Sequence, residues 1–183
     1  MPATLSEQLV ELDRALAAAA VPHAFGGAIA LAYCTLEPRG TRDLDVNIFV
    51  DQERCAAALA ALPSGVDVPD AAPETITRDG QMRLWWDDTP VDVFFDNLPV
   101  HAQAARHVRR VPFAGTEIPV LGPTELVVFK AMFDRTKDWA DIEAVIEAEA
   151  VDLEQVRETL ADLVDETDQR FARIDEAERR ARR

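Results

Sequence analysis

Two aspartates at the start of a strongly apolar segment are the residues most able to do chemistry. Asp43 and Asp45 enter the run 44–50, which is rich in Val and Ile. Because side chains two residues apart on a strand point to the same face, we expect the two carboxylates to project side by side. Hard oxygen ligands suit Mg²⁺, which is usually shared with substrate phosphates. Asp-x-Asp alone is a weak signal, since acidic residues are common at strand ends.

A third carboxylate strengthens this interpretation. Asp92 lies inside the apolar run 91–95, where its burial without a partner would be costly. If this strand pairs beside the first, Asp92 completes a metal site with Asp43 and Asp45. A two-metal scheme then applies, in which one ion activates the attacking oxygen and the other holds the triphosphate and the leaving pyrophosphate. The alternative is a solvated Asp92 near the turn at 87–88.

A pair of glycines precedes the aspartates. Gly26 and Gly27 stand between a short extended piece, 23–25, and a small-residue helix expected over 28–36. Glycines at such a junction let the backbone approach a phosphate, whose charge the helix N-terminus favours. Gly-Gly is weak by itself and becomes informative because Asp-x-Asp follows after one short helix.

The segment 26–33 followed by 41–46 resembles the DNA polymerase β-type nucleotidyltransferase superfamily. It is similar to the small bacterial branch that includes the abortive-infection, type IV toxin enzymes and their relatives. Serine often follows the first glycine there, and Gly27 is a variant of that pattern. The resemblance implies transfer of a nucleoside monophosphate from an NTP, with Mg²⁺ on the three aspartates and with Gly26, Gly27 and Arg42 at the nucleotide.

A downstream motif extends the resemblance. The segments 125–130 and 135–142 resemble the second motif of these enzymes, which implies that Lys130 contacts nucleotide phosphates and that Asp141 supports catalysis or positions the lysine. Lys130 and Lys137 are the only lysines of the chain, and a lysine point charge suits phosphate. The alternative is a surface salt-bridge network, which the helical spacings allow. The spacing from Lys130 to Asp141 is shorter than in the toxin enzymes, which argues against toxin activity.

The expected elements place these residues on strands and helices. Helical spacing of leucines, with Thr4 or Ser6 as cap, predicts a first helix that ends before Pro22. Strands are expected over 44–50, 81–86 and 91–95, and a second hairpin over 108–113 and 117–121. Helices are expected over 54–62, 123–134 and 139–150, with one last helix from about 152 toward the C-terminus. The stretch 63–79 is expected to be a long polar connection.

Composition limits the classes of function. The chain has 183 residues, which fits one domain or a domain with a helical extension. A net charge of −15 argues against a broad basic surface for nucleic acid. No segment reaches transmembrane length or has the pattern of a signal peptide, so we expect a cytoplasmic protein without a membrane partner.

These observations predict an α/β (α+β) fold, a small mixed twisted sheet flanked by helices and nucleotidyltransferase-like. The predicted parts are a core over 1–122 and a C-terminal helical segment over 123–183 packed on it. The expected function is Mg²⁺-dependent nucleotidyl transfer from an NTP to a hydroxyl of RNA, such as a tRNA end, of a protein or of a small molecule. It could act as a toxin with a cognate antitoxin. The alternative is a non-catalytic nucleotide- or partner-binding module on the same fold.

Overall fold

A mixed sheet organises the described part of the chain, residues 3–38 and 40–182 of a computed structural model. Residues 1–2 and 39 of the predicted core over 1–122, and residue 183 of the predicted helical segment over 123–183, lie outside the described part. The sheet has seven strands in the order β3-β4-β5-β2-β1-β7-β6. The strands are β1 (His23–Phe25), β2 (Leu44–Asp51), β3 (Val66–Asp67), β4 (Gln81–Trp86), β5 (Thr89–Asp96), β6 (Arg109–Phe113) and β7 (Thr116–Val120).

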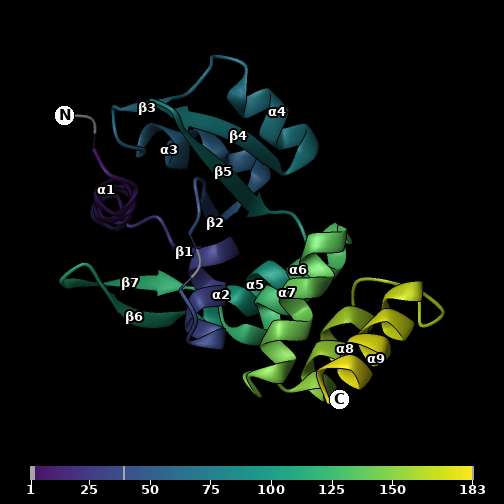
Figure 1. Cartoon of the computed structure of the whole chain (residues 1–183). Helices are drawn as coiled ribbons and strands as arrows, with labels where there is room; N and C mark the ends of the chain where they lie inside the picture. Colours follow the sequence, from purple (N-terminus) through teal and green to yellow (C-terminus); the bar gives the residue numbers. More distant parts are fainter. Residues whose placement is uncertain (1–2, 39, 183) are drawn as a thin grey trace.

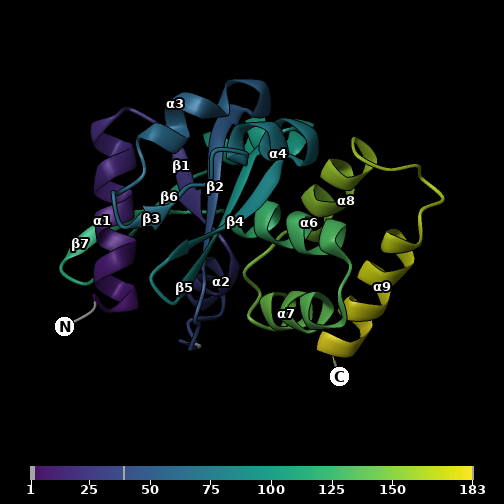
Figure 2. The ribbon, with the colours of Figure 1, turned by 90° about the horizontal axis from the view of Figure 1, so that it is seen from above.

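Helices surround this sheet. They are α1 (Leu5–Ala18), α2 (Gly27–Thr35), α3 (Cys55–Ala60), α4 (Ala72–Asp79), α5 (Pro99–Arg106), α6 (Pro123–Phe133), α7 (Thr136–Glu147), α8 (Leu153–Ala161) and α9 (Gln169–Ala181). Helices α6–α9 gather at one side of the molecule and α1 lies at the other, as Figures 1 and 2 show. Across the described residues, none of the helices combines the length and apolar character needed to cross a membrane. The mixed sheet with flanking helices confirms the predicted fold class.

The two strands that carry the aspartates are neighbours. Strands β2 and β5 pair in parallel, and Asp45 lies directly opposite Asp92 in the register. Along β5, the buried Val91, Val93 and Phe95 alternate with partly buried residues on the other face, including Asp92. Because the side-chain period of a strand is two, this alternation turns Asp92 and Asp45 to the same face of the sheet. The prediction that the second strand lies beside the first is confirmed.

Local signals located several elements correctly. Thr4 caps α1 through a capping box with Glu7, and Leu9, Leu12 and Leu16 of this helix are buried. The β4–β5 and β6–β7 hairpins form as expected. Helices α6 and α7 also form, α7 three residues earlier than expected, because Asp138 caps the backbone N–H of Arg135.

The prediction of a polar connection over 63–79 is wrong, because this stretch contains β3 and α4. Pro73 stands in the first turn of α4, and Gly80 ends the helix in the left-handed region at φ 71°. Only Ala72 and Ile76 of this helix are buried, and its 8 residues are too few for the apolar pattern to repeat along the sequence.

The prediction of one last helix is also wrong. The chain forms α8 and α9, separated by a turn in which Asp165 accepts from Thr167 and Asp168 caps α9 by accepting from the backbone N–H of Arg170. Such side-chain acceptors compete with the helical backbone and favour a new start. Helix α5, which no sequence pattern indicated, begins at Pro99 after β5.

Candidate functional site

A cavity of about 520 Å³ opens beside β2, β5 and the helices α6 and α7. Its volume falls within the roughly 300–1,000 Å³ of small-molecule sites. Six carboxylates line it (Asp43, Asp45, Asp79, Asp92, Asp138 and Asp141), together with four cationic side chains (Arg83, Lys130, Arg135 and Lys137). The structure therefore brings together all five residues predicted to be catalytic, although they come from two strands and two helices far apart in the sequence.

Asp45 is the electrostatic centre of this cavity. Burial, together with the negative charges of Asp43 and Asp92, raises the pKa of its carboxyl from 3.8 to about 6, against the opposing charges of Lys130 and Lys137. Three carboxylates thus stand close enough to interact strongly. An arrangement of this kind favours a bound cation, which removes the repulsion and leaves Asp45 ionised.

Two neighbours fix the conformation around the pair Asp43 and Asp45. Thr41 donates a hydrogen bond to the carboxylate of Asp43. Gly27 lies directly against Asp45: its φ is +49°, and a Cβ there would stand 1.8 Å from Asp45 Oδ2. A residue with a side chain at 27 would therefore both strain the backbone and displace the carboxylate. The close packing of Asp45 therefore explains why the second residue of the Gly-Gly pair is a glycine.

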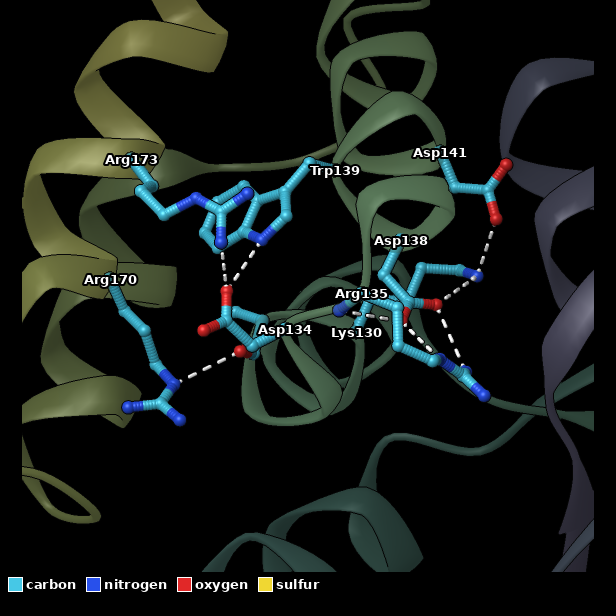
Figure 3. A network of polar contacts seen from close by, with 9 residues as sticks. Lys130, Asp134, Arg135, Asp138, Trp139, Asp141, Arg170 and Arg173 are labelled. Carbon is cyan, nitrogen blue, oxygen red and sulfur yellow. Dashed lines mark hydrogen bonds and ion pairs between the residues drawn. The ribbon is translucent and has the colours of Figure 1, made fainter.

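Lys130 faces the aspartates from α6 and is buried. Its Nζ donates to Asp141 Oδ2 at 2.7 Å and lies 3.8 Å from Asp138 Oδ1 (Figure 3). Asp138 in turn accepts two hydrogen bonds from the Arg135 guanidinium, at 2.6 and 3.1 Å. A salt-bridge network, one of the two interpretations of this motif, is therefore present, and it forms part of the cavity wall. Lys137 is exposed and lines the same cavity.

The turn between α6 and α7 is tied to the C-terminal helix. Asp134 accepts from Trp139 Nε1 at 2.8 Å and from Arg173 of α9 (Figure 3). The Arg173 guanidinium also lies over the Trp139 ring, 4.2 Å from its centroid. Arg170 donates to the backbone carbonyl of Ala131 at 3.0 Å. These contacts hold α9 against the segment that carries Lys130 and Arg135, and they separate Asp134 from the lysine network.

Arg83 is a residue of this cavity that the sequence interpretation missed. Its Nε and Nη2 donate to the two carboxylate oxygens of Asp92, both at 2.7 Å. The hydrogen bonds and charge of Asp92 raise the pKa of the arginine. Arg83 lies opposite Asp92 in the β4–β5 register. A two-residue turn at 87–88 fixes this register, so the hairpin in the sequence contained the signal.

Other predicted residues occupy different positions. Gly26 is not among the residues that line the cavity, and its backbone N–H donates to the carbonyl of Asp45 at 2.9 Å. Arg42 is exposed and does not line the cavity, whereas Thr41 beside it does. The sequence interpretation also missed an aromatic wall, in which Phe94 and Phe133 meet edge to face at 5.5 Å between ring centroids.

The carboxylates offer the hard oxygen donors that Mg²⁺ requires. In the arrangement that residues 3–38 and 40–182 adopt, no three Asp, Glu, His or Cys side chains make a group that could hold a metal ion. Arg83 occupies both carboxylate oxygens of Asp92, which is one reason why Asp92 does not form such a group with its neighbours. The donor chemistry therefore fits a divalent cation, and the assignment of Asp43, Asp45 and Asp92 as its ligands stays a prediction.

Comparison with known proteins bears on the fold. No protein-family model and no curated protein matches this sequence. The solution structure of the antibiotic-resistance factor ANT(2'')-Ia is similar, with a TM-score of 0.62 at 14% identity over 98% of this chain and 100% of that one. A nucleotidyltransferase-like protein from Paracoccidioides brasiliensis reaches a TM-score of 0.45 at 13% identity, over 96% and 95% of the two chains. The first similarity shows that this chain has a nucleotidyltransferase-like fold.

Proposed function

We propose that this chain is a nucleotidyltransferase, which transfers a nucleoside monophosphate from an NTP to an acceptor hydroxyl with the help of Mg²⁺. The observation that carries the proposal is the register of Asp45 with Asp92 on adjacent parallel strands, in a cavity that also contains Asp43 and Lys130. Carboxylates and a lysine around one cavity match the needs of phosphoryl transfer, which depends mainly on positioning and charge neutralisation.

Each group has a distinct part in this proposal. Asp43, Asp45 and Asp92 would hold the cation, which activates the attacking hydroxyl and neutralises the charge of the triphosphate. Lys130, kept in place by Asp141, presents one positive charge from the opposite wall toward the phosphates. Gly27 allows Asp45 to sit close against the start of α2. The nucleotide phosphates would then lie between α2 and α6.

The acceptor is best matched by a neutral or cationic molecule. The chain carries a net charge of −15, and six carboxylates line the cavity against four cationic groups. A polyanionic RNA would be repelled by such a field, whereas a small hydroxylated compound or a protein side chain would not. A cytoplasmic toxin restrained by an antitoxin is a biological setting for the same chemistry and calls for a protein or tRNA acceptor.

The test is transfer of label from each of the four NTPs, in the presence of Mg²⁺, to total tRNA, to cell proteins and to small metabolites. We expect transfer by the wild-type chain and its loss in Asp45→Asn. Asp88→Asn is the matched control, because it removes an exposed carboxylate from the nearby β4–β5 turn and should leave transfer unchanged. Mg²⁺-dependent NTP binding without transfer to any acceptor would instead establish the non-catalytic binding module.

A further inference from the structure

The pairing of Arg83 with Asp92 has a consequence for how the cavity accepts a cation. Both carboxylate oxygens of Asp92 accept from the guanidinium in a fork at 2.7 Å, the strongest geometry for such a pair. Asp92 is a proposed metal ligand, so a cation at that carboxylate must displace at least part of the fork. Two positive groups on one carboxylate also repel each other.

The solvent exposure of the Arg83 side chain allows it to leave Asp92. Its side chain is 51% exposed, while that of Asp92 is 17% exposed. The arginine therefore covers the carboxylate from the solvent side, on strand β4, and can leave without opening the core. Asp92 is fixed in the interior of β5 between two paired strands.

The other guanidinium and the buried lysine of the cavity are held differently. Lys130 pairs with Asp141, and Arg135 pairs with Asp138, both on α7. A cation at the three aspartates would leave those pairs intact. Among the cationic side chains that the structure describes in this cavity, Arg83 alone is hydrogen-bonded to a proposed ligand, so the cation would release Arg83 and not the others.

We propose that Arg83 is a positioning residue that exchanges partners. It holds Asp92 in the cation-free chain and moves to the phosphates of the donor nucleotide when the cation takes Asp92. Phosphate is a natural second partner, because a guanidinium binds phosphate oxygens with the same planar fork that it uses for a carboxylate. The cation and the nucleotide would then bind cooperatively. This inference rests on the proposed function of the same cavity.

The test is a titration of Mn²⁺, as a spectroscopically visible probe, into wild-type chain and Arg83→Gln, followed by calorimetry with NTP analogues that carry a non-cleavable α–β bond. We expect Arg83→Gln to bind Mn²⁺ roughly 5- to 50-fold more tightly without nucleotide, a range typical of coupled sites. We also expect it to bind the Mn²⁺-analogue complex more weakly than wild type. An unchanged or lower Mn²⁺ affinity would overturn the proposal.

Arg135→Gln is the matched control, because it removes one guanidinium from the same cavity but from a carboxylate that is not a proposed ligand. A gain in Mn²⁺ affinity equal to that of Arg83→Gln would mean a general field effect and would also overturn the exchange. Arg83→Lys keeps the charge, loses the fork and is expected to give an intermediate Mn²⁺ affinity; it carries the test if Arg83→Gln does not fold. If the wild-type chain does not bind Mn²⁺, the proposed function itself is contradicted. If the wild-type chain transfers nucleotide but Arg83→Gln has the same Mn²⁺ affinity as the wild type, only the exchange is contradicted.

Discussion

Asp45 shows at the residue scale how a functional group can oppose stability. Its carboxyl is partly buried, faces two like charges and has a pKa of about 6 in the folded chain. The folded state therefore binds a proton at this site more tightly than the unfolded state does. A raised carboxyl pKa contributes stability that is fully present below pH 3.8 and is lost as the pH rises through 6.

Replacing Asp45 by Asn should therefore stabilise the cation-free chain at neutral pH. In the presence of EDTA at pH 8, we expect Asp45→Asn to raise the free energy of unfolding by roughly 1–3 kcal/mol, with the gain vanishing toward pH 4. Denaturant titrations of both proteins across this pH range measure the difference. A gain that is the same at every pH would rule out the titration of Asp45 as its cause.

Gly27 allows a second prediction at the residue scale. Gly27→Ala places a Cβ 1.8 Å from Asp45 Oδ2 at a φ of +49°, so we expect it to abolish nucleotidyl transfer and to destabilise the chain. Gly115→Ala is the matched control: its φ is +81° and no atom lies within 4 Å of the added Cβ. The control isolates the backbone strain, on the order of 1 kcal/mol. Equal losses of stability and activity in the two variants would show that contact with Asp45 is unimportant.

At the scale of elements, α9 acts as a support for the turn between α6 and α7. Asp134 joins Trp139 of α7 to Arg173 of α9, and Arg170 reaches the backbone of α6. The turn carries Arg135 and lies one helical turn after Lys130, so its position determines where both cations lie. Helix α9 therefore supports the elements that form the wall of the cavity, although none of its described residues lines the cavity itself.

Removing Arg173 should loosen this support. We expect Arg173→Ala to lower Tm by roughly 2–6 °C, because it removes a hydrogen bond and a cation–π contact that cross two helices. Differential scanning fluorimetry and limited proteolysis of α9 measure the effect. Arg179→Ala is the control, since Arg179 pairs with Glu176 of the same helix, three residues before it, and its removal should leave Tm unchanged. Equal shifts in both variants would argue against a specific support.

At the scale of the whole molecule, charge is the dominant feature. The chain has 34 acidic and 19 basic side chains, which gives the net charge of −15. Self-repulsion of this size weakens the compact state and is screened by salt. The same field concentrates cations near the cavity and opposes polyanions, which agrees with the neutral or cationic acceptor that we propose.

Salt should consequently stabilise the protein. We expect Tm to rise as NaCl is increased from about 0.01 M to about 1 M, over which the Debye length falls from roughly 30 Å to roughly 3 Å. Thermal unfolding in a series of NaCl concentrations tests this, with KCl as a check that the effect is one of ionic strength. A fall of Tm with salt would show that favourable ion pairs outweigh the net repulsion.

The sequence by itself determined the strands and helices that carry the site, because their signals are local. Alternation in 44–50 and 91–95, the glycine pair and the capped α1 depend on residues within a few positions of each other. It also identified the nucleotidyltransferase-like fold and the aspartates, through the order in which these segments follow one another. The mixed sheet followed from the same pattern.

Only the tertiary structure decided which groups face one another. The pairing of Arg83 with Asp92, the fit of Gly27 against Asp45 and the clamp of Arg173 on Asp134 join residues up to 39 positions apart. Strand register, helix packing and backbone torsion set these contacts. The pair Arg83 and Asp92 lies within one hairpin, whereas the other two contacts join segments that no short window of sequence contains. Helix α4 and the division of the last helix were missed for other reasons. Helix α4 has only two buried positions, and the turn between α8 and α9 depends on the acceptors Asp165 and Asp168.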